Sequence, residues 1–430
     1  MIIGVVIFFI NLIVGAAFFR RYLFRDSFFP AAALFIAVYP FVIFTAMMIG
    51  IPLNVFTINW PLVLLPWVLI RHPPAPWSGL GPRAKNRFTL LLFIAVVVLI
   101  IVTVVQIMKA PLFERDGLGI WLTKAKMIAL DRNLSGTNFF DPLRIHDKPR
   151  YPLMVPLLEA SFMVQTGISE WSVKLVFAYI WILILGTLYE QLNRRAPSTA
   201  LPAVISLSLI PAYYCLADGG LHTGYADIPI SLFYLTAIVF LTEYRRTANM
   251  RPLIGTGLAV AAAVFTKNEG YAFALAVFTA LCLGRERPSK VALAMLSALV
   301  PLVPWLLTVF RLPAVHQEHY AAALPGLLSR LPSVLVIIKN TVLELLDLRH
   351  WGLFWLSQPV ILFIAKPTPE LRSPLAILAA TLILYLAVYL LTPWDIPFQM
   401  SVSLPRLLLH LAPAGIYLTA AAIGPAVERT

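Results

Sequence analysis

Long apolar stretches separated by short polar loops run through almost the whole chain. A helix needs about twenty mostly apolar residues to cross a lipid bilayer, and the sequence offers many segments of about that length. The pattern predicts about thirteen transmembrane helices, at residues 2–19, 28–50, 52–70, 88–108, 172–192, 200–217, 228–243, 252–266, 269–283, 290–310, 352–365, 374–391 and 406–423. We therefore expect an all-α polytopic membrane protein.

Basic residues in the short loops predict how these spans are oriented. Arg20 and Arg21 follow the first apolar stretch, and residues 71–87 contain further basic side chains. Cytoplasmic loops carry an excess of Lys and Arg, so we expect the N-terminus outside and the C-terminus, with a short tail at 424–430, in the cytoplasm. Positive charge after the first stretch, and not before it, favours a retained anchor over a cleavable signal peptide.

Composition supports a membrane protein and argues against nucleic-acid binding. Hydrophobic residues make up 60% of the chain and charged residues 12%, whereas soluble domains average about 25% charged residues. The net charge of +13 comes from 33 Lys and Arg against 20 Asp and Glu, and the excess lies largely in loops predicted to be cytoplasmic. The two cysteines, Cys215 and Cys282, fall in predicted spans near opposite faces, which excludes a disulfide framework or a zinc motif.

Two long polar loops are predicted on the external side, at residues 109–171 and 311–351. The first holds most of the clustered charge of the chain, between Glu114 and Pro156. Such a loop is too long to be only a connector, and charges held at a membrane surface indicate a functional site. The second contains an amphipathic stretch at 333–346. We expect the first loop to carry the active site.

Residues 152–167 within the first loop are apolar and almost long enough to cross the membrane. The next firm span ends at Arg194 and Arg195, which favour the cytoplasm, so that span must begin outside. Pro152 and Pro156 suit the start of a helix better than its middle. We therefore predict a helix that lies along the outer leaflet or dips into it.

Candidate chemistry in the first loop begins at Asp116, directly after the fourth span. A carboxylate held rigidly at a membrane exit can act as a general base toward an acceptor hydroxyl, although a charge cluster at the end of a span has the same sequence. Lys124 and Lys126 can bind a phosphate as point charges. The alternative for these lysines is contact with lipid headgroups through extended side chains.

Two turns between later spans carry further candidates. Asp227 lies in a Gly-Tyr-Ala-Asp-Ile-Pro sequence, where it can either contact substrate or cap the following helix. Lys267 and Glu269 lie between two apolar stretches with almost no loop. Charges in such a place usually face a cavity or each other, so the alternatives are a phosphate site and an internal ion pair.

Arg406 and His410 are one helical turn apart at the outer end of the last predicted span. Two cations on one helix face suit a phosphate group. The alternative is an anchoring arginine beside a buried histidine. The sequence shows no pattern of His, Cys, Asp and Glu that is typical of a metal site.

Taken in order, these motifs resemble those of polytopic lipid-linked-sugar glycosyltransferases of the GT-C superfamily, in particular the protein O-mannosyltransferases and aminoarabinose transferases of glycosyltransferase family 39. The resemblance covers residues 88–423 and leaves residues 1–87 as additional N-terminal spans. Arg115 and Gln399 depart from it, because relatives often have an aromatic residue and a histidine there. The matching residues are Asp116, Trp121, Lys124-Ala125-Lys126, Tyr151-Pro152-Leu153, Pro156, Ala226-Asp227-Ile228-Pro229, Thr266–Gly270, Thr392–Asp395, Ser403 and Arg406-Leu407.

The resemblance implies an enzyme of the GT-C fold that transfers a sugar from a polyprenyl-phosphate donor to a glycan, lipid or protein acceptor on the external side, with inversion. Asp116 would be the catalytic base. The leaving phosphate would be held by Lys267 and Arg406 with Lys124 or Lys126, and Glu269 would orient Lys267. Further substrate contacts are expected at Glu114, His146, Asp147, Tyr151, Asp227 and His410. No cofactor is expected, and a need for a divalent cation is left open.

A transporter or flippase of lipid-linked saccharides is the main alternative function, and a membrane scaffold is another. Transporters place ionisable residues near the middle of the membrane on broken helices, often within inverted repeats. In this sequence the carboxylates gather at the outer ends of the predicted spans, and no repeat is visible. The distribution of charge therefore favours an enzyme with an external active site.

Overall fold

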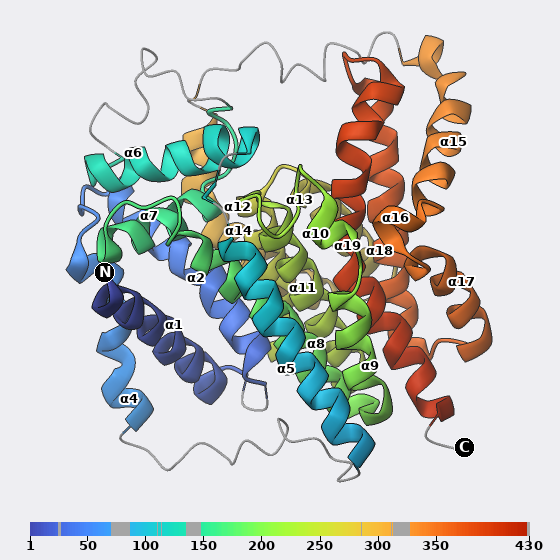
Figure 1. Ribbon diagram of the computed structural model, residues 1–430, viewed down its shortest axis with the longest axis horizontal. Coiled ribbons are helices and arrows are strands. Elements are labelled where there is room, and N and C mark those ends of the chain that lie inside the picture. The colour runs from blue at the N-terminus through green and yellow to red at the C-terminus, as the bar shows by residue number, and fades with distance from the viewer. Residues whose placement is uncertain are drawn as a thin grey trace.

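The computed structural model of the protein describes residues 1–24, 27–69, 87–109, 111–112, 114–134, 148–284, 286–310, 312 and 327–427. Regular secondary structure in these ranges is helical, which confirms the predicted all-α fold (Figure 1). The candidate sites His146 and Asp147 lie outside the described residues. The longer helices are α1 (Ile2–Tyr22), α2 (Phe29–Met48), α5 (Arg87–Met108), α8 (Lys174–Arg195), α11 (Asp227–Thr247), α14 (Pro288–Val309), α18 (Pro369–Val388) and α19 (Ile396–Val427).

Nine helical segments among the described residues are long and apolar enough to cross a membrane. They include α9 (Pro197–Ser208), which continues through α10 (Ala212–Cys215). Shorter apolar helices add α12 (Met250–Thr266), α13 (Gly270–Leu283) and α17 (Phe354–Ala365). The protein is therefore a polytopic membrane protein, and the exact number of thirteen spans remains a prediction.

The third predicted span, at 52–70, is not a single helix. It consists of α3 (Val55–Ile58), the 3-10 helix η1 (Trp60–Leu64) and α4 (Leu65–Leu69). The Asn54 side chain accepts hydrogen bonds from the backbone of Phe56 and Thr57 and starts a new helix inside the apolar stretch. Pro61 then stands in the first turn of η1. Caps and prolines thus divide a segment whose hydropathy alone suggested one span.

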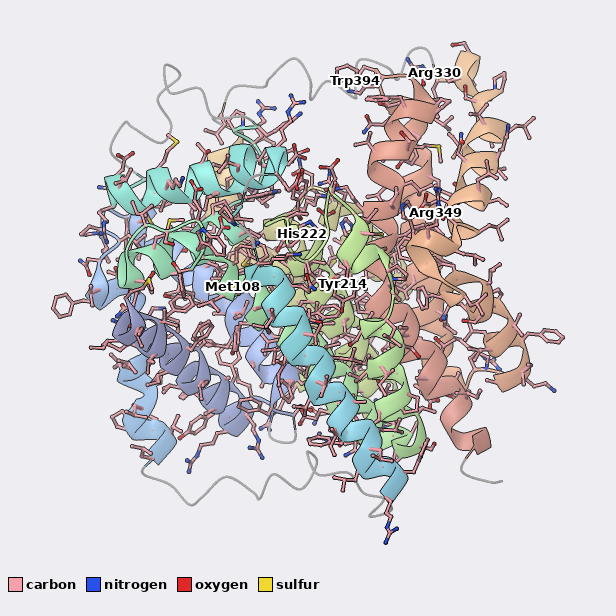
Figure 2. All side chains as sticks on the ribbon, in the orientation of Figure 1. Met108, Tyr214, His222, Arg330, Arg349 and Trp394 are labelled. Atoms are coloured by element: carbon pink, nitrogen blue, oxygen red, sulfur yellow. The ribbon has the colours of Figure 1, made fainter. Side chains whose placement is uncertain are left out.

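The last helix, α19 (Ile396–Val427), is longer than the span predicted at 406–423. It begins at Ile396, where the Asp395 carboxylate accepts a hydrogen bond from the Phe398 backbone N–H at 3.0 Å. Pro397 lies in the first turn, where a proline is tolerated. Arg330 of η5 (Leu328–Arg330) donates to the Thr392 carbonyl and ties this end to the second external loop, near Trp394 in Figure 2.

The amphipathic stretch predicted at 333–346 forms α15 (Ser333–Leu345), which packs against α19. Two more short elements complete this part of the chain, α16 (Leu348–Trp351) and η6 (Tyr389–Leu391). The predicted second external loop is therefore partly helical within the residues that the structure describes.

The predicted first external loop forms three helical elements: the π-helix η2 (Gly117–Leu122), α6 (Thr123–Asp131) and α7 (Met154–Thr166). In Figure 1, α6 and α7 lie next to each other near the end of α2. The helix predicted at 152–167 is therefore present. Its residues from Met154 to Met163 are all buried, and it packs against α1, α2 and α6. It is thus embedded in the protein, and its position relative to the outer leaflet remains a prediction.

Helix α11 lies at the centre of the molecule. It packs against α2, α8, α12, α18 and α19, and nearly all of its residues are buried. Figure 2 shows the side chains that fill the space between these helices. Because α11 begins at Asp227, the central position of this helix also places Asp227 in the middle of the surrounding charged residues.

Candidate active site

Asp227 is the centre of a cluster of charged residues drawn from three parts of the chain. Its side chain is fully buried. One oxygen, Oδ1, is 2.9 Å from Lys267 Nζ and 2.7 Å from His410 Nε2, and the other, Oδ2, is 3.2 Å from an Arg406 nitrogen. Asp227 is the first residue of α11 and makes no capping bond. The carboxylate therefore holds the cations together and does not cap the helix.

Lys267 occupies the turn between α12 and α13 in an extended conformation. Besides Asp227, its Nζ contacts Glu269 Oε1 at 2.8 Å. The internal pair that we considered as an alternative is thus present, and Asp227 extends it. A Cβ at Gly270 would lie 2.4 Å from the backbone of Ala263, so only glycine allows α13 to approach α12 this closely.

Arg406 connects this buried cluster to Asp116. One of its terminal nitrogens lies 3.4 Å from Asp116 Oδ2, and its guanidinium lies over the Tyr225 ring, 4.7 Å from the centroid. Gly219, at φ +94°, leaves room for the arginine, since a Cβ there would lie 3.0 Å from Arg406 Cγ. Residues 290 positions apart in the sequence therefore meet at one site.

Tyr225 also fixes the position of Asp116. The Asp116 backbone N–H donates to the Tyr225 hydroxyl at 3.2 Å, and that hydroxyl donates to Asp218 Oδ1 at 2.6 Å. The Asp116 side chain is 33% exposed, whereas that of Asp227 is 0% exposed. Of the two, only Asp116 is open to a substrate.

Behind the cluster, His410 extends into a buried chain of hydroxyl groups. Its Nδ1 lies 3.2 Å from the Tyr385 hydroxyl, which lies 2.6 Å from that of Tyr234. The Tyr234 hydroxyl donates to the Glu269 carbonyl at 3.0 Å. His410 has no exposed surface, so in this geometry it supports Asp227 and does not face a substrate.

The two candidate lysines of the first loop are engaged within the protein. Lys124 is fully buried, and its Nζ donates to the carbonyl oxygens of Lys148 at 2.5 Å and Tyr151 at 3.3 Å. Lys126 forms an ion pair with Glu170 at 2.5 Å. Lys124 therefore holds the loop around Tyr151 in place, and phosphate binding by either lysine remains a prediction.

Glu114 and Tyr151 lie on either side of η2 in the sequence. Burial raises the pKa of the Glu114 carboxyl, and the nearby charge of Asp218 raises it further. Tyr151 packs on Trp121 with ring centroids 5.7 Å apart. Glu114 thus belongs to the acidic surroundings of the site, and Tyr151 belongs to the packing beneath η2.

Sequence reasoning missed several polar residues that organise the site. Tyr225 stands two positions before Asp227 in the same turn, so its motif was found but its role was not. Tyr234 and Tyr385 lie inside apolar spans, where a tyrosine gives no sequence signal of its hydrogen-bond partner. Glu170 is distant from Lys126 in the sequence, and nothing in the local pattern indicates that pair.

A metal centre is not apparent in the part of the chain that the structure describes, where no group of three or more His, Cys, Asp or Glu side chains is arranged to hold an ion. Residues 135–147, outside the described ranges, contain further candidates. Dependence on a divalent cation therefore remains open.

The apolar helices and a match to a family model together support a membrane glycosyltransferase of the GT-C type. Residues 147–308 match the family model of the dolichyl-phosphate-mannose-protein mannosyltransferases, which confirms the resemblance predicted from the motifs. The matched region contains Asp227, Lys267 and Glu269 but neither Asp116 nor Arg406. Neither a curated protein nor a solved structure matches the chain.

Proposed function

We propose that the protein transfers a sugar from a polyprenyl-phosphate donor to an acceptor hydroxyl on the external face of the membrane, with Asp116 as the general base. The observation that carries this proposal is the contact between the partly exposed Asp116 and Arg406, which also holds the buried Asp227. A base and a cation for the leaving group are thus adjacent.

In the proposed step, Asp116 removes the proton of the acceptor hydroxyl while the acceptor oxygen attacks the anomeric carbon of the donor sugar. The bond between that carbon and the lipid phosphate oxygen breaks, and its electron pair stays on the phosphate. The donor is a phosphodiester with one negative charge, and the released polyprenyl phosphate has two. Because the leaving group needs no proton, a single carboxylate suffices, unlike the pair that a glycoside hydrolase uses.

Arg406 is the cation best placed to stabilise the growing charge on the phosphate. Its contact with Asp116, at 3.4 Å, is longer than its 3.2 Å contact with Asp227. A donor phosphate can compete for this weaker contact, which would release Asp116 toward the acceptor. Lys267 adds positive charge from the buried side of Asp227. Fixed charges are effective there because that side of the site is shielded from water.

Other carboxylates are less suited to the role of base. Asp227 is fully buried, and Lys267, Arg406 and His410 surround its oxygens, so an acceptor hydroxyl cannot reach it. The Glu269 side chain is 27% exposed and pairs with Lys267, which suits it to orient that lysine. The proposed roles of these residues thus follow from burial and pairing.

The direct test is a transfer assay with the purified full-length protein in lipid nanodiscs. The donor is a radiolabelled polyprenyl-phosphate hexose, and the panel of acceptors includes a lipid-linked glycan, a lipid and a peptide. We expect label on an acceptor together with one released polyprenyl phosphate per transfer. Movement of intact donor across the bilayer of sealed vesicles without cleavage would instead identify a flippase.

A further inference from the structure

A cavity of about 630 Å³ lies at the opposite ends of the helices that carry the candidate active site. Glu243 lines this cavity and is sixteen residues after Asp227 on α11. At a rise of about 1.5 Å per residue, the two lie about 24 Å apart along the helix. The cavity is therefore separate from the charge cluster, at the face that the basic loops predict to be cytoplasmic.

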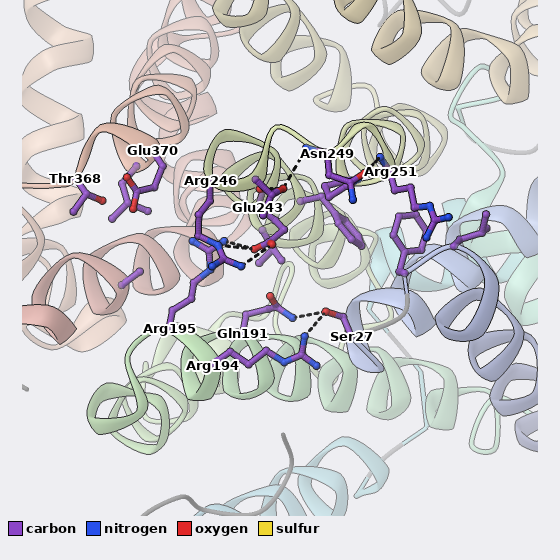
Figure 3. A pocket seen from close by; sticks show the side chains of 18 residues that line it. Ser27, Gln191, Arg194, Arg195, Glu243, Arg246, Asn249, Arg251, Thr368 and Glu370 are labelled. Carbon is purple, nitrogen blue, oxygen red and sulfur yellow. Dashed lines mark hydrogen bonds and ion pairs between the residues drawn. The ribbon is translucent and has the colours of Figure 1, made fainter. Parts of the chain in front are cut away.

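The polar wall of the cavity is rich in arginine. Arg194, Arg195, Arg246 and Arg251 line it together with two carboxylates, Glu243 and Glu370, so its lining is net positive (Figure 3). These arginines come from the inner ends of α8 and α11 and from the start of α12, which follows α11 directly in the sequence.

Pairing within the cavity leaves positive charge available. Glu243 lies between two arginines, 2.7 Å from a nitrogen of Arg195 and 2.8 Å from one of Arg246. Arg194 is paired with Glu190 at 2.9 Å and also donates to the Ser27 hydroxyl at 3.1 Å. Within the described ranges, no carboxylate forms an ion pair with Arg251. Glu243 is thus shared by Arg195 and Arg246, and Arg251 has no carboxylate partner within the described ranges.

Another part of the wall is apolar. Phe24, Val239, Phe240 and Leu371 line it beside the arginines. A small inorganic anion would use only the arginines and would leave this surface uncovered. A molecule with an anionic headgroup and a hydrocarbon chain can contact both parts of the wall. Arginine binds phosphate oxygens well, and the apolar side chains can pack against the hydrocarbon chain.

We propose that this cavity binds the headgroup of an anionic phospholipid, with its phosphate held by the arginines of the wall and the adjoining chain against the apolar part. Basic pockets between transmembrane helices on the cytoplasmic side are known to take such headgroups. The bound lipid would tie the inner ends of α8, α11 and α12 together. This proposal is independent of the transfer reaction.

The test uses the full-length protein in vesicle-derived nanodiscs of phosphatidylcholine with a minor fraction of phosphatidylglycerol, and native mass spectrometry counts the lipid retained. The test variant is Arg246→Gln with Arg251→Gln. Glu243 keeps Arg195 as a partner in this variant, so the cavity is not left with an unpaired carboxylate. The control variant, Arg287→Gln with Arg372→Gln, removes the same charge from two exposed positions outside the cavity, one just before α14 and one in the first turn of α18.

We expect the test variant to bind phosphatidylglycerol about tenfold more weakly, which corresponds to about 1.4 kcal/mol, while the control variant binds as the natural protein does. Equal loss in both variants, or no loss in either, would overturn the proposal. Inorganic phosphate forms the last arm of the experiment. If it displaces phosphatidylglycerol from the natural protein at equal concentration, the cavity is a free-phosphate site and the lipid assignment is wrong.

Discussion

At the scale of single residues, Asp227 has the strongest structural role in the site. Its carboxylate is the only negative charge shared by Lys267, Arg406 and His410 among the contacts described above. Removing one partner from a buried ion pair leaves the other charge uncompensated, which costs about 3–5 kcal/mol. The same residue also positions the cations that we assign to the leaving phosphate, so stability and activity are coupled here.

We predict that Asp227→Asn lowers the free energy of unfolding by about 3–5 kcal/mol, because an amide cannot neutralise the buried Lys267 and Arg406. Thermal unfolding of the purified protein in detergent measures the change. Asp395→Asn is the matched control, since Asn caps a helix about as well as Asp and that side chain is at the start of α19. Equal effects of the two substitutions would show that Asp227 is not the centre of the cluster.

At the scale of secondary structure elements, η2 positions Asp116 by close backbone packing. A Cβ at Gly117 would lie 2.1 Å from the Thr223 carbonyl oxygen, whereas a Cβ at Gly119 would meet no atom within 4 Å. The structure shows that Gly117 leaves room for the turn that also carries Tyr225 and Asp227.

We predict that Gly117→Ala reduces transfer strongly, because the added methyl group must push η2 and Asp116 away from Arg406. A displacement of about 1 Å can cost about 100-fold in rate. Gly119→Ala makes the same substitution where no atom is near, and its transfer rate should stay within about twofold of that of the natural protein. Transfer assays on both variants decide the point, and similar activities would mean that η2 does not set the position of Asp116.

Most helices could be predicted from the sequence, because apolar length alone defines α1, α2, α5, α8, α11 and α14. The segment at 52–70 could not, since capping by Asn54 and the position of Pro61 outweigh its hydropathy. The start of α19 depended on Asp395, whose role as a cap cannot be distinguished from a catalytic one in the sequence. Local hydrogen bonds therefore decided the elements that we predicted wrongly.

At the scale of the whole molecule, the site forms because α11, α19 and the turn between α12 and α13 bring distant residues together. Sequence motifs identified Asp116, Asp227, Lys267 and Arg406 individually. Their pairing could not be predicted, because it depends on how the helices pack. The burial of Lys124 was not foreseen, and the burial of His410 was one of two alternatives that the sequence left open. The N-terminal helices pack against α7, α8 and α12, and their status as a separate unit remains a prediction.

The orientation of the molecule in the membrane is a further prediction, based on the basic loops. In a background with Cys215→Ser and Cys282→Ser, a cysteine at Ile168 should react with a membrane-impermeant maleimide in intact cells. A cysteine at Ser289 should react only after the membrane is opened. Both positions are exposed, so reactivity reports sidedness. Labelling of both from the same side would contradict the external placement of the site.

The measurement that tests the central claim most directly is single-turnover transfer by Asp116→Asn with saturating donor. General-base catalysis contributes about 10²–10⁴-fold in rate, so transfer should fall by that factor, while donor binding and thermal stability stay close to those of the natural protein. Glu114→Gln, two positions away, should be the milder change. Near-normal transfer by Asp116→Asn, or a deeper loss in Glu114→Gln, would show that Asp116 is not the base.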